Sequence, residues 1–367
     1  MSLAVGDCRV TLARWAAEGV RVQCVVTSPP YWGLRDYSTA PQVWDGDAAC
    51  PHEWEEETRT LDNNNGKGDS STAAAVAFNA ESRYKRVVTG ACLRCAAWRG
   101  SLGLEPTPEQ YVAHLVEVFR RVREVLADDG TLWLNLGDSY NSSSQNNHGK
   151  GGAMEHAHLA PRDGWAGHRP MVPGLKPKDL VGIPWRVAFA LQADGWWLRS
   201  DIIWAKPNPM PESVTDRPTK AHEYVFLLTK SERYFYDAAS IREPDAGTDH
   251  PRSVLHRPEP TGGLMSPHAG IRKADGRNGD GRNRRSVWTI ATQPYPEAHF
   301  ATFPEDLVKP CILAGSRPDD TVLDPFMGSG TVAKVAQDLG RQWLGCELNP
   351  AYAGMCERRT LQQGLAL

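Results

Sequence analysis

The segment from Thr321 to Ala333 constrains the fold of this chain most strongly. Residues 321–323 are predicted as a short buried strand, and residues 331–339 as a helix. Between them, Gly328 and Gly330 predict a tight turn at which the backbone can approach a ligand closely. A helix that begins at such a turn presents unpaired amide groups, which bind carboxylates or phosphates. This strand–turn–helix unit is typical of parallel α/β sheets.

The rest of the chain alternates between the same two kinds of element. Strands are predicted at 20–27, 131–136, 197–205, 222–229 and 343–346, and helices at 107–127, 179–193 and 307–314. The first of these helices has the clearest signal, because Thr107 can cap it and Pro108 suits its first turn. We therefore predict an α/β fold with a mixed, mostly parallel sheet and helices on both faces.

Three polar segments interrupt this alternation. Residues 38–104 contain a run of asparagine and glycine and are predicted as an inserted segment. Residues 141–170 are predicted as a mobile loop, and residues 237–296 form a third region rich in proline and glycine. The remaining segments, 1–37, 105–236 and 297–367, are predicted to form one catalytic domain.

The glycine turn has features that disfavour two common ligand classes, nucleoside triphosphates and dinucleotides. It lacks the Gly-Lys-Ser/Thr of triphosphate-binding loops, and it departs from the Gly-x-Gly-x-x-Gly pattern of dinucleotide-binding loops. Glu347 follows about 20 residues later, at the end of the next predicted strand, where an acidic side chain suits hydrogen bonds to ribose hydroxyls. The turn is therefore expected to bind a nucleoside-containing cofactor of another kind.

A second motif, Thr27-Ser-Pro-Pro-Tyr-Trp32, directly follows the strand predicted at 20–27. Ligands in open α/β sheets bind beyond the carboxyl ends of the strands, so this motif lies where chemistry is expected. Pro29 and Pro30 stiffen the loop and fix its carbonyl groups. A Pro-Pro-Tyr sequence alone also occurs as a packing turn or a protein-interaction motif. Its interpretation as a site motif therefore depends on the presence of the glycine turn in the same chain.

Together the two motifs resemble those of DNA amino-methyltransferases of the β arrangement, in which the catalytic motif precedes the cofactor motif. The resemblance covers most of the chain and implies a Rossmann-like fold that uses S-adenosylmethionine. Gly6-Asp7-Cys8 resembles the element that contacts the cofactor adenine, and 299–306 resembles a segment that completes the pocket. The implied cofactor-binding residues are Asp7, Phe300, Asp324, Phe326, Gly328, Ser329, Gly330, Thr331, Glu347 and Asn349.

The implied catalytic residues are Ser28, Pro29, Pro30 and Tyr31. The Ser28 hydroxyl and the Pro29 carbonyl would accept the two N–H groups of an exocyclic amine, and Tyr31 would stack on a base flipped from duplex DNA. Within this family, serine at the first position is associated with cytosine N4, whereas Asp or Asn is associated with adenine N6. We therefore predict methylation of cytosine N4 without a covalent intermediate.

Other functions stay open at this level. They are methylation of adenine N6, methylation of RNA or of protein glutamine, and nucleic-acid binding by a zinc-bearing protein with an inactive methyltransferase fold. A C5-cytosine mechanism would need a cysteine nucleophile. The dipeptide Pro310-Cys311 looks like such a site, but Cys311 follows helical spacing and is predicted to be a packed helix residue.

A metal site is predicted within the inserted segment. Cys50 and His52 form one close pair of soft ligands, and Cys92 and Cys95 form another. Two such pairs suit a tetrahedral zinc site, and four protein ligands would make it structural. The segment has few apolar residues, so a metal could supply stability that a core cannot.

Target recognition is predicted within 237–296, where β-arrangement enzymes keep this region. Basic side chains there could contact phosphates or read guanine, and a solvated loop is the alternative for each of them. They are Arg272, Lys273, Arg277, Arg282, Arg284 and Arg285. The net charge of −3 disfavours binding by the whole surface but not by a local basic face.

The composition places the chain in a cytoplasmic setting. No run of about 18 apolar residues predicts a membrane span, and the first residues do not read as a signal peptide. The expected partners are double-stranded DNA and a cognate restriction endonuclease, with no membrane. A monomer and a homodimer are both compatible with the sequence.

Overall fold

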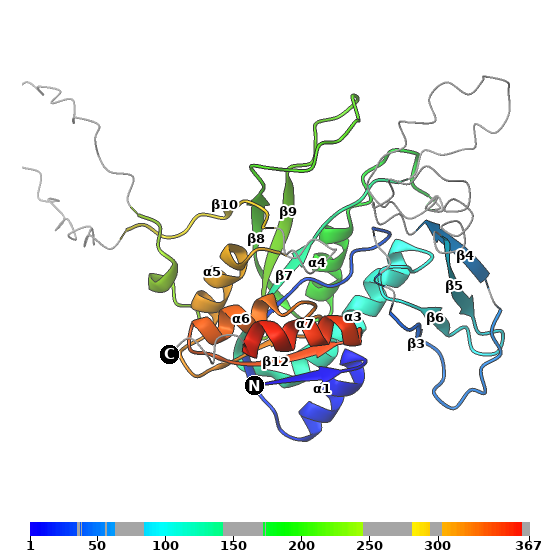
Figure 1. Ribbon diagram of the computed structural model, residues 1–367, viewed down its shortest axis with the longest axis horizontal. Helices are drawn as coiled ribbons and strands as arrows, with labels where there is room; N and C mark the ends of the chain where they lie inside the picture. The colour runs from blue at the N-terminus through cyan, green and yellow to red at the C-terminus, as the bar shows by residue number, and fades with distance from the viewer. Residues whose placement is uncertain are drawn as a thin grey trace, which may run out of the picture.

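The computed structural model describes residues 1–34, 37, 39–55, 57–62, 84–141, 172, 174–244, 281–293 and 303–361. Figure 1 shows a central sheet flanked by helices, with a smaller sheet to one side. The predicted loop at 141–170 lies almost wholly outside the described residues.

Eight strands form the central sheet. Their order across the sheet is β1 (Ser2–Val5), β12 (Gln342–Glu347), β11 (Thr321–Asp324), β2 (Val22–Thr27), β7 (Leu126–Leu136), β9 (His222–Thr229), β8 (Trp197–Ala205) and β10 (Val287–Thr289). Strand β9 runs antiparallel to both of its neighbours, and the other adjacent pairs are parallel. The predicted mixed, mostly parallel sheet is therefore confirmed.

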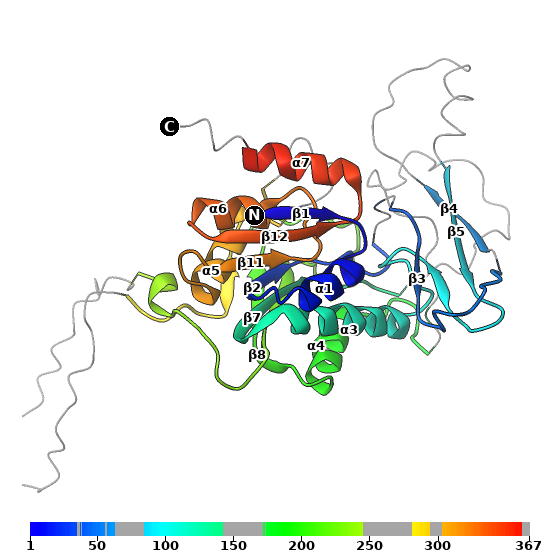
Figure 2. The same ribbon diagram turned by 90° about the horizontal axis from the view of Figure 1, so that it is seen from below.

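Helices cover both faces of this sheet, as Figure 2 shows. On one face lie α1 (Cys8–Ala17), α3 (Pro108–Val125) and α4 (Ile183–Ala193), and on the other lie α5 (Glu305–Gly315) and α6 (Thr331–Asp338). The described residues also form the 3₁₀-helix η1 (Ala239–Ile241) and the helix α7 (Pro350–Leu361). Helix α7 contacts α6. Side chains along β2 alternate between the two cores, with Val25 in one and Cys24 and Val26 in the other.

Helix α3 shows how local sequence sets an element's start while pairing sets its end. Thr107 caps it by accepting a hydrogen bond from the Gln110 amide at 3.2 Å, as its sequence predicts. The helix ends at Val125 rather than near Ala127, because Leu126 is already extended and pairs with Val22 of β2. Strand β7 therefore begins at Leu126, five residues before the start of the strand predicted at 131–136.

A separate antiparallel sheet lies within the inserted segment. It consists of β3 (Gln42–Trp44), β6 (Trp98–Gly100), β5 (Tyr84–Ala91) and β4 (Glu57–Asp62), in that order. It stands to the right of the central sheet in Figure 1. The sequence predicted the insertion but not these strands, nor β1, α1, β10 and α7.

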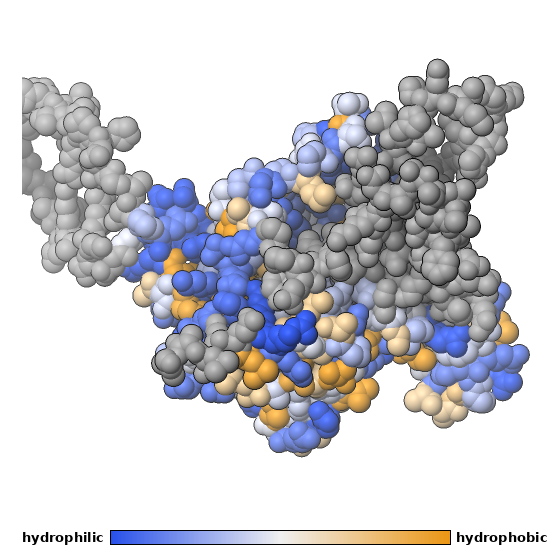
Figure 3. All heavy atoms as spheres, in the orientation of Figure 1, coloured by the Kyte–Doolittle hydropathy of each residue, from blue (hydrophilic) through white to orange (hydrophobic). Residues whose placement is uncertain are grey.

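The face of the molecule in Figure 3 is mostly hydrophilic, with apolar residues gathered near β1 and α1. The N-terminal segment exposes Met1, Val5 and Val10. Within the described part of the chain, no helix combines the length and apolarity that crossing a membrane requires.

Candidate functional site

The two sequence motifs meet at one edge of the central sheet. Strands β2 and β11 are parallel neighbours, so their carboxyl ends bring Thr27 and Asp324 together. The Thr27 hydroxyl donates to Asp324 Oδ1 at 2.6 Å, and Asp324 is 1% exposed. A buried hydrogen bond thus joins segments that are almost 300 residues apart.

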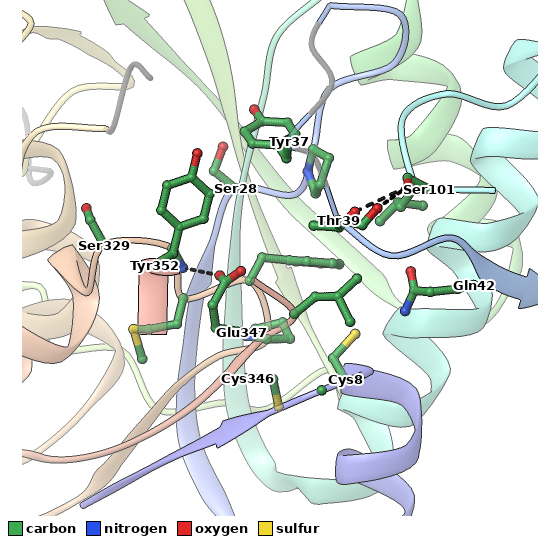
Figure 4. Close-up of a pocket in the computed structure, with 18 of the residues that line it drawn as sticks. Cys8, Ser28, Tyr37, Thr39, Gln42, Ser101, Ser329, Cys346, Glu347 and Tyr352 are labelled. Atoms are coloured by element: carbon green, nitrogen blue, oxygen red, sulfur yellow. Dashed lines mark hydrogen bonds between the residues drawn. The ribbon is translucent and has the colours of Figure 1, made fainter. Parts of the chain in front are cut away.

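A pocket opens beside this contact. Ser28 and Pro30 of the catalytic motif line it together with Phe326, Gly328 and Ser329 of the glycine turn. In Figure 4, Ser329, Glu347 and Tyr352 lie on one side, and Tyr37, Thr39 and Ser101 lie on the other. Further lining residues are Gly6, Cys8, Gln42, Trp44, Leu102, Leu104, Phe303, Pro325, Met327, Thr331, Cys346 and Leu348.

The glycine turn has the open backbone that its sequence predicts. Gly328 has φ +54, and an added Cβ there would meet nothing closer than 3.9 Å, so the space in front of it is free. The Ser329 hydroxyl oxygen is buried and has no hydrogen-bond partner among the described residues. Gly330 has φ +85 and precedes α6. The turn therefore offers a ligand one hydroxyl that has no partner among the described residues, and open space in front of Gly328.

Glu347 lies at the end of β12, as predicted, and lines the same pocket. Its two carboxylate oxygens accept from the Gly328 and Asn349 amides, both at 2.7 Å. Burial raises the pKa of this carboxyl, although these amides favour the charged form. The carboxylate is thereby fixed in orientation at the pocket wall, where its remaining lone pairs can accept from hydroxyl groups.

Two predicted cofactor-binding residues, Asp7 and Asn349, do not line the pocket. Asp7 caps α1 and pairs with the Arg9 guanidinium at 2.7 Å, while its neighbours Gly6 and Cys8 line the pocket. Asn349 orients Glu347 through its amide and contacts the Tyr37 carbonyl at 3.3 Å. Phe300 lies outside the described residues, whereas Phe303 from the same predicted segment lines the pocket.

Asp324 sits behind the turn rather than in the pocket wall. Its Oδ1 accepts from the Phe326 amide at 2.9 Å as well as from Thr27. Burial raises the pKa of this carboxyl to about 7, although both hydrogen bonds favour the charged form. The protonated form is therefore the one that folding favours.

This raised pKa predicts a pH-dependent contribution to stability. The native chain binds the Asp324 proton more tightly than the unfolded chain does, so the contribution is complete below about pH 4 and is lost as the pH rises through about 7. Asp324→Asn keeps an acceptor for Thr27 and Phe326 but cannot ionise. Urea unfolding at pH 5 and pH 8 should show that the wild type loses more stability than the variant. Equal losses would contradict this assignment.

The predicted catalytic loop, residues 28–33, is held by hydrogen bonds to residues between 103 and 111. Tyr111 of α3 donates to the Pro30 carbonyl at 2.8 Å, so this carbonyl is already used. The Trp32 indole donates to the Glu105 carbonyl at 3.0 Å, and the Gly33 amide to the Gly103 carbonyl at 2.7 Å. The loop therefore has a fixed shape before any substrate binds.

A hydrogen-bond chain that the sequence did not predict leads away from Ser28. The Ser28 hydroxyl donates to Tyr31 Oη at 3.1 Å. Tyr31 Oη can donate its one proton to Glu223 Oε2 at 2.7 Å, the nearer acceptor, or to Asn135 Oδ1 at 2.9 Å. Glu223 pairs with Lys206 and accepts from Asn135 at 3.2 Å. Burial opposes charge on Glu223, but Lys206, Tyr31 and Asn135 together hold its pKa below the ordinary value.

The ring of Tyr31 packs on Gly137 at the end of β7. A Cβ added to Gly137 would come within 2.6 Å of the Tyr31 ring, so only glycine allows this approach. The hydroxyl and the ring thus have different contacts. Stacking of Tyr31 on a flipped base stays a prediction.

The four predicted metal ligands lie together beside the small sheet. Cys50 Sγ is 3.9 Å from Cys92 Sγ, and Cys95 Sγ is 3.4 Å from His52 Nδ1. All four ligand atoms lie within 4.8 Å of one another. The structure therefore brings the two predicted pairs to one point.

The predicted DNA contacts are only partly described. Arg272, Lys273 and Arg277 lie outside the described residues. Arg282 and Arg285 both pair with Glu243, at 3.1 and 2.9 Å, and the Arg284 guanidinium lies 4.6 Å from the centroid of the Trp288 ring. Exposed ion pairs contribute only about 0–1 kcal/mol, so a phosphate could compete for these side chains.

Comparison with known proteins identifies the family. The family model for DNA methylases of the N6_N4_Mtase type matches residues 22–358. The chain is 40% identical to the Type II methyltransferase M.SmaI of Serratia marcescens, over 98% of this chain and 90% of the relative. It is 42% identical to the Type II methyltransferase M.XycI of Xanthomonas campestris pv. cyanopsidis, over 96% and 85% of the two chains.

A solved structure shares the fold. The cytosine-N4-specific PvuII DNA methyltransferase has a TM-score of 0.52 and 16% identity, over 98% of this chain and 85% of that chain. This similarity supports the arrangement of the sheet and helices described above. With its catalytic loop and glycine turn lining one pocket, and with relatives that it matches over nearly their whole length, the chain belongs to the N6_N4_Mtase family of DNA methylases.

Proposed function

We propose that the protein transfers a methyl group from S-adenosylmethionine to N4 of a cytosine flipped from duplex DNA. The observation that carries this proposal is the single pocket shared by Ser28 and Pro30 of the catalytic loop and by Gly328 and Ser329 of the glycine turn. One wall can hold a cofactor while the other holds an amine. The two reactants can therefore meet without rearrangement of the sheet.

The cofactor side of the pocket fits S-adenosylmethionine. The space in front of Gly328 admits a ligand, and Glu347 can accept from ribose hydroxyls. The Ser329 hydroxyl, which has no partner in the part of the chain that the structure describes, can bond to a polar group. Aromatic and apolar side chains, including Phe326, can cover the adenine. When bound, S-adenosylmethionine supplies an electrophilic methyl group on a sulfonium, and S-adenosylhomocysteine leaves.

The catalytic loop can make the exocyclic amine of the base a better nucleophile. An exocyclic amine is a poor nucleophile, because its lone pair is delocalised into the ring. Since Ser28 donates its own proton to Tyr31, the lone pairs of Ser28 stay available to accept an amine N–H. The Pro29 carbonyl would accept the second N–H. These two acceptors draw the nitrogen toward a tetrahedral geometry, which frees its lone pair for attack on the methyl group.

The same hydrogen-bond chain gives the released proton a path. After methylation, the amine nitrogen is cationic and strongly acidic, so a weak acceptor is enough. Ser28 can accept this proton as it passes its own to Tyr31, and Tyr31 can pass its own to Glu223. Before the reaction, the Lys206 ammonium balances the negative charge of the Glu223 carboxylate.

Serine at position 28 supports cytosine as the base, because the family resemblance associates serine there with N4. Methylation of adenine N6 is the second candidate, since the family model covers both chemistries.

The relatives are named Type II methyltransferases, which supports a partner restriction endonuclease and cytoplasmic duplex DNA as the substrate. The arginines at 282, 284 and 285 are proposed to contact that DNA.

A transfer assay with methyl-labelled S-adenosylmethionine tests the substrate class. We expect label in duplex DNA, competition by S-adenosylhomocysteine, and no label in RNA or in added protein. Label confined to RNA or protein would reject DNA as the substrate. Retention of DNA with no transfer to any acceptor would instead support an inactive, DNA-binding fold.

Replacing Tyr31 with phenylalanine isolates the hydrogen-bond chain from ring packing. The ring contact with Gly137 is kept, while Ser28 loses its acceptor and Glu223 loses a donor. Hydrogen bonds to charged groups contribute about 1.5–3 kcal/mol, so kcat should fall about 10- to 100-fold with little change in cofactor affinity. Tyr234→Phe is the matched control, because its hydroxyl contacts exposed Arg199 away from the pocket. Unchanged kcat in Tyr31→Phe would remove the chain from the mechanism.

A further inference from the structure

The cluster of Cys50, His52, Cys92 and Cys95 has the dimensions of a tetrahedral metal site. With Zn–S near 2.3 Å and Zn–N near 2.0 Å, a regular tetrahedron places two sulfurs about 3.8 Å apart and a sulfur and a nitrogen about 3.5 Å apart. The corresponding distances are 3.9 Å and 3.4 Å. A disulfide would need sulfur atoms about 2.0 Å apart, and it would leave the other two ligands unexplained.

The backbone supports each pair of ligands with a tight turn. The Cys50 amide donates to the Asp47 carbonyl at 3.0 Å, and the Ala96 amide donates to the Cys92 carbonyl at 3.1 Å. The Arg94 amide donates a hydrogen bond to Cys92 Sγ at 3.4 Å. A negatively charged thiolate accepts such a hydrogen bond well. The two turns are joined where the Leu93 amide donates to the Glu53 carbonyl at 2.8 Å.

We propose that these four residues bind one structural zinc ion. Three thiolates and an imidazole match the ligand preference of Zn²⁺, and four protein ligands leave no position for a substrate or a reactive water. The fold around the cluster needs such a link, because β3 and β6 are only three residues each. Zinc binding would therefore supply folding free energy to the small sheet.

The zinc ion would also shape the pocket, because both strands that it holds lead into the pocket wall. Gln42 and Trp44 of β3 line the pocket shortly before Cys50, and Ser101, Leu102 and Leu104 line it shortly after Cys95. The latter segment also carries the Gly103 carbonyl that fixes the catalytic loop. The metal is thus placed to hold two walls of the pocket at once.

A buried histidine joins this small sheet to the catalytic domain. His114 of α3 is fully buried and stacks against the rings of Trp44 and Trp98, whose centroids are 4.5 and 5.5 Å from its own. Its two nitrogens each lie 2.9 Å from a carboxylate oxygen, one of Glu105 and one of Asp45. Asp45 directly precedes Gly46, at which an added Cβ would come within 3.0 Å of Cys95 Sγ. The segment beside Cys95 is therefore linked to α3 through the hydrogen bond between Asp45 and His114.

Metal analysis of the purified full-length protein tests the zinc proposal directly. We expect an equimolar amount of zinc in the wild type, and its loss in the double variant Cys92→Ser, Cys95→Ser. Cys311→Ala is the matched control, because Cys311 is buried in α5 outside the cluster, and it should retain the metal. Protein loaded with cobalt should show the visible absorption of a tetrahedral thiolate site, whether or not the double variant folds. Wild-type protein without metal, or a Cys50–Cys92 disulfide in it, would overturn the proposal.

The expected effect of zinc on the pocket wall rests on the proposed function. It is measured separately, by the affinity for S-adenosylmethionine. Removing zinc with a chelator should weaken S-adenosylmethionine binding at least tenfold, as measured by calorimetry, and adding zinc back should restore it. Unchanged affinity after removal would overturn the link between the metal and the pocket wall while leaving the metal site intact. If the zinc-loaded protein binds no S-adenosylmethionine, the proposed function fails and the metal analysis still stands.

Discussion

Replacing Ser28 with alanine is expected to lower kcat at least about a hundredfold. The hydroxyl is the one side-chain group of the catalytic loop that is proposed to accept an amine N–H, and positioned proton acceptors of this kind contribute about 10²- to 10⁴-fold. The loop itself should keep its shape, because the hydrogen bonds that hold it involve Pro30, Trp32 and Gly33 and do not use the Ser28 hydroxyl. Initial rates at saturating cofactor and DNA measure the effect.

Ser329→Ala is the matched control for this variant. Ser329 lines the same pocket on the cofactor side, so its loss should raise the KM for S-adenosylmethionine and leave kcat largely unchanged. The two serine variants should therefore differ in which kinetic constant they change. A Ser28→Ala enzyme with normal kcat would remove Ser28 from the mechanism.

Gly330→Ala is expected to abolish most cofactor binding and to destabilise the fold. Gly330 has φ +85, which costs a side chain about 1–2 kcal/mol. The added Cβ would also lie 2.6 Å from Cys356 Sγ and 2.9 Å from Cys356 Cα, so the turn must move away from α7. Overpacking of this kind costs about 1–3 kcal/mol more. Because Ser329 and Gly328 move with the turn, calorimetry should show at least a tenfold weaker affinity for S-adenosylmethionine.

Gly340→Ala separates backbone strain from the clash. Gly340 has φ +71, but an added Cβ there would meet nothing within 4 Å. This variant should lose only about 1–2 kcal/mol in urea unfolding and should bind the cofactor normally. Similar losses of affinity in both variants would show that strain alone, and not the contact with Cys356, controls the turn.

The sequence predicted the parts of the site that adjacent residues encode. The strand, the glycine turn and the helix between Thr321 and Leu339 follow one another, so their local signals place Gly328 and Ser329 correctly. Ser28 could be placed in the same way, because a strand leads directly into the Pro-Pro turn. Each motif follows a predicted strand, and in open α/β sheets ligands bind beyond the carboxyl ends of the strands.

The remaining parts of the site depend on contacts between distant segments. Glu223 is reached from Tyr31 only because β9 runs antiparallel to β7, so that its first residues lie at the edge where the parallel strands end. No local pattern shows that reversal. Likewise, Gln42 and Ser101 reach the pocket through a small sheet whose short strands have little periodicity. The metal ligands were predictable, because their spacing is itself the signal.

The most direct test of the central claim is the identity of the methylated base. Unmethylated duplex DNA is incubated with the purified protein and S-adenosylmethionine, then digested to nucleosides and separated by liquid chromatography with mass spectrometry. The proposed role of Ser28 and its pocket predicts N4-methyldeoxycytidine, which should be absent when Ser28→Ala protein is used. N6-methyldeoxyadenosine as the product, or no methylated nucleoside at all, would contradict the account.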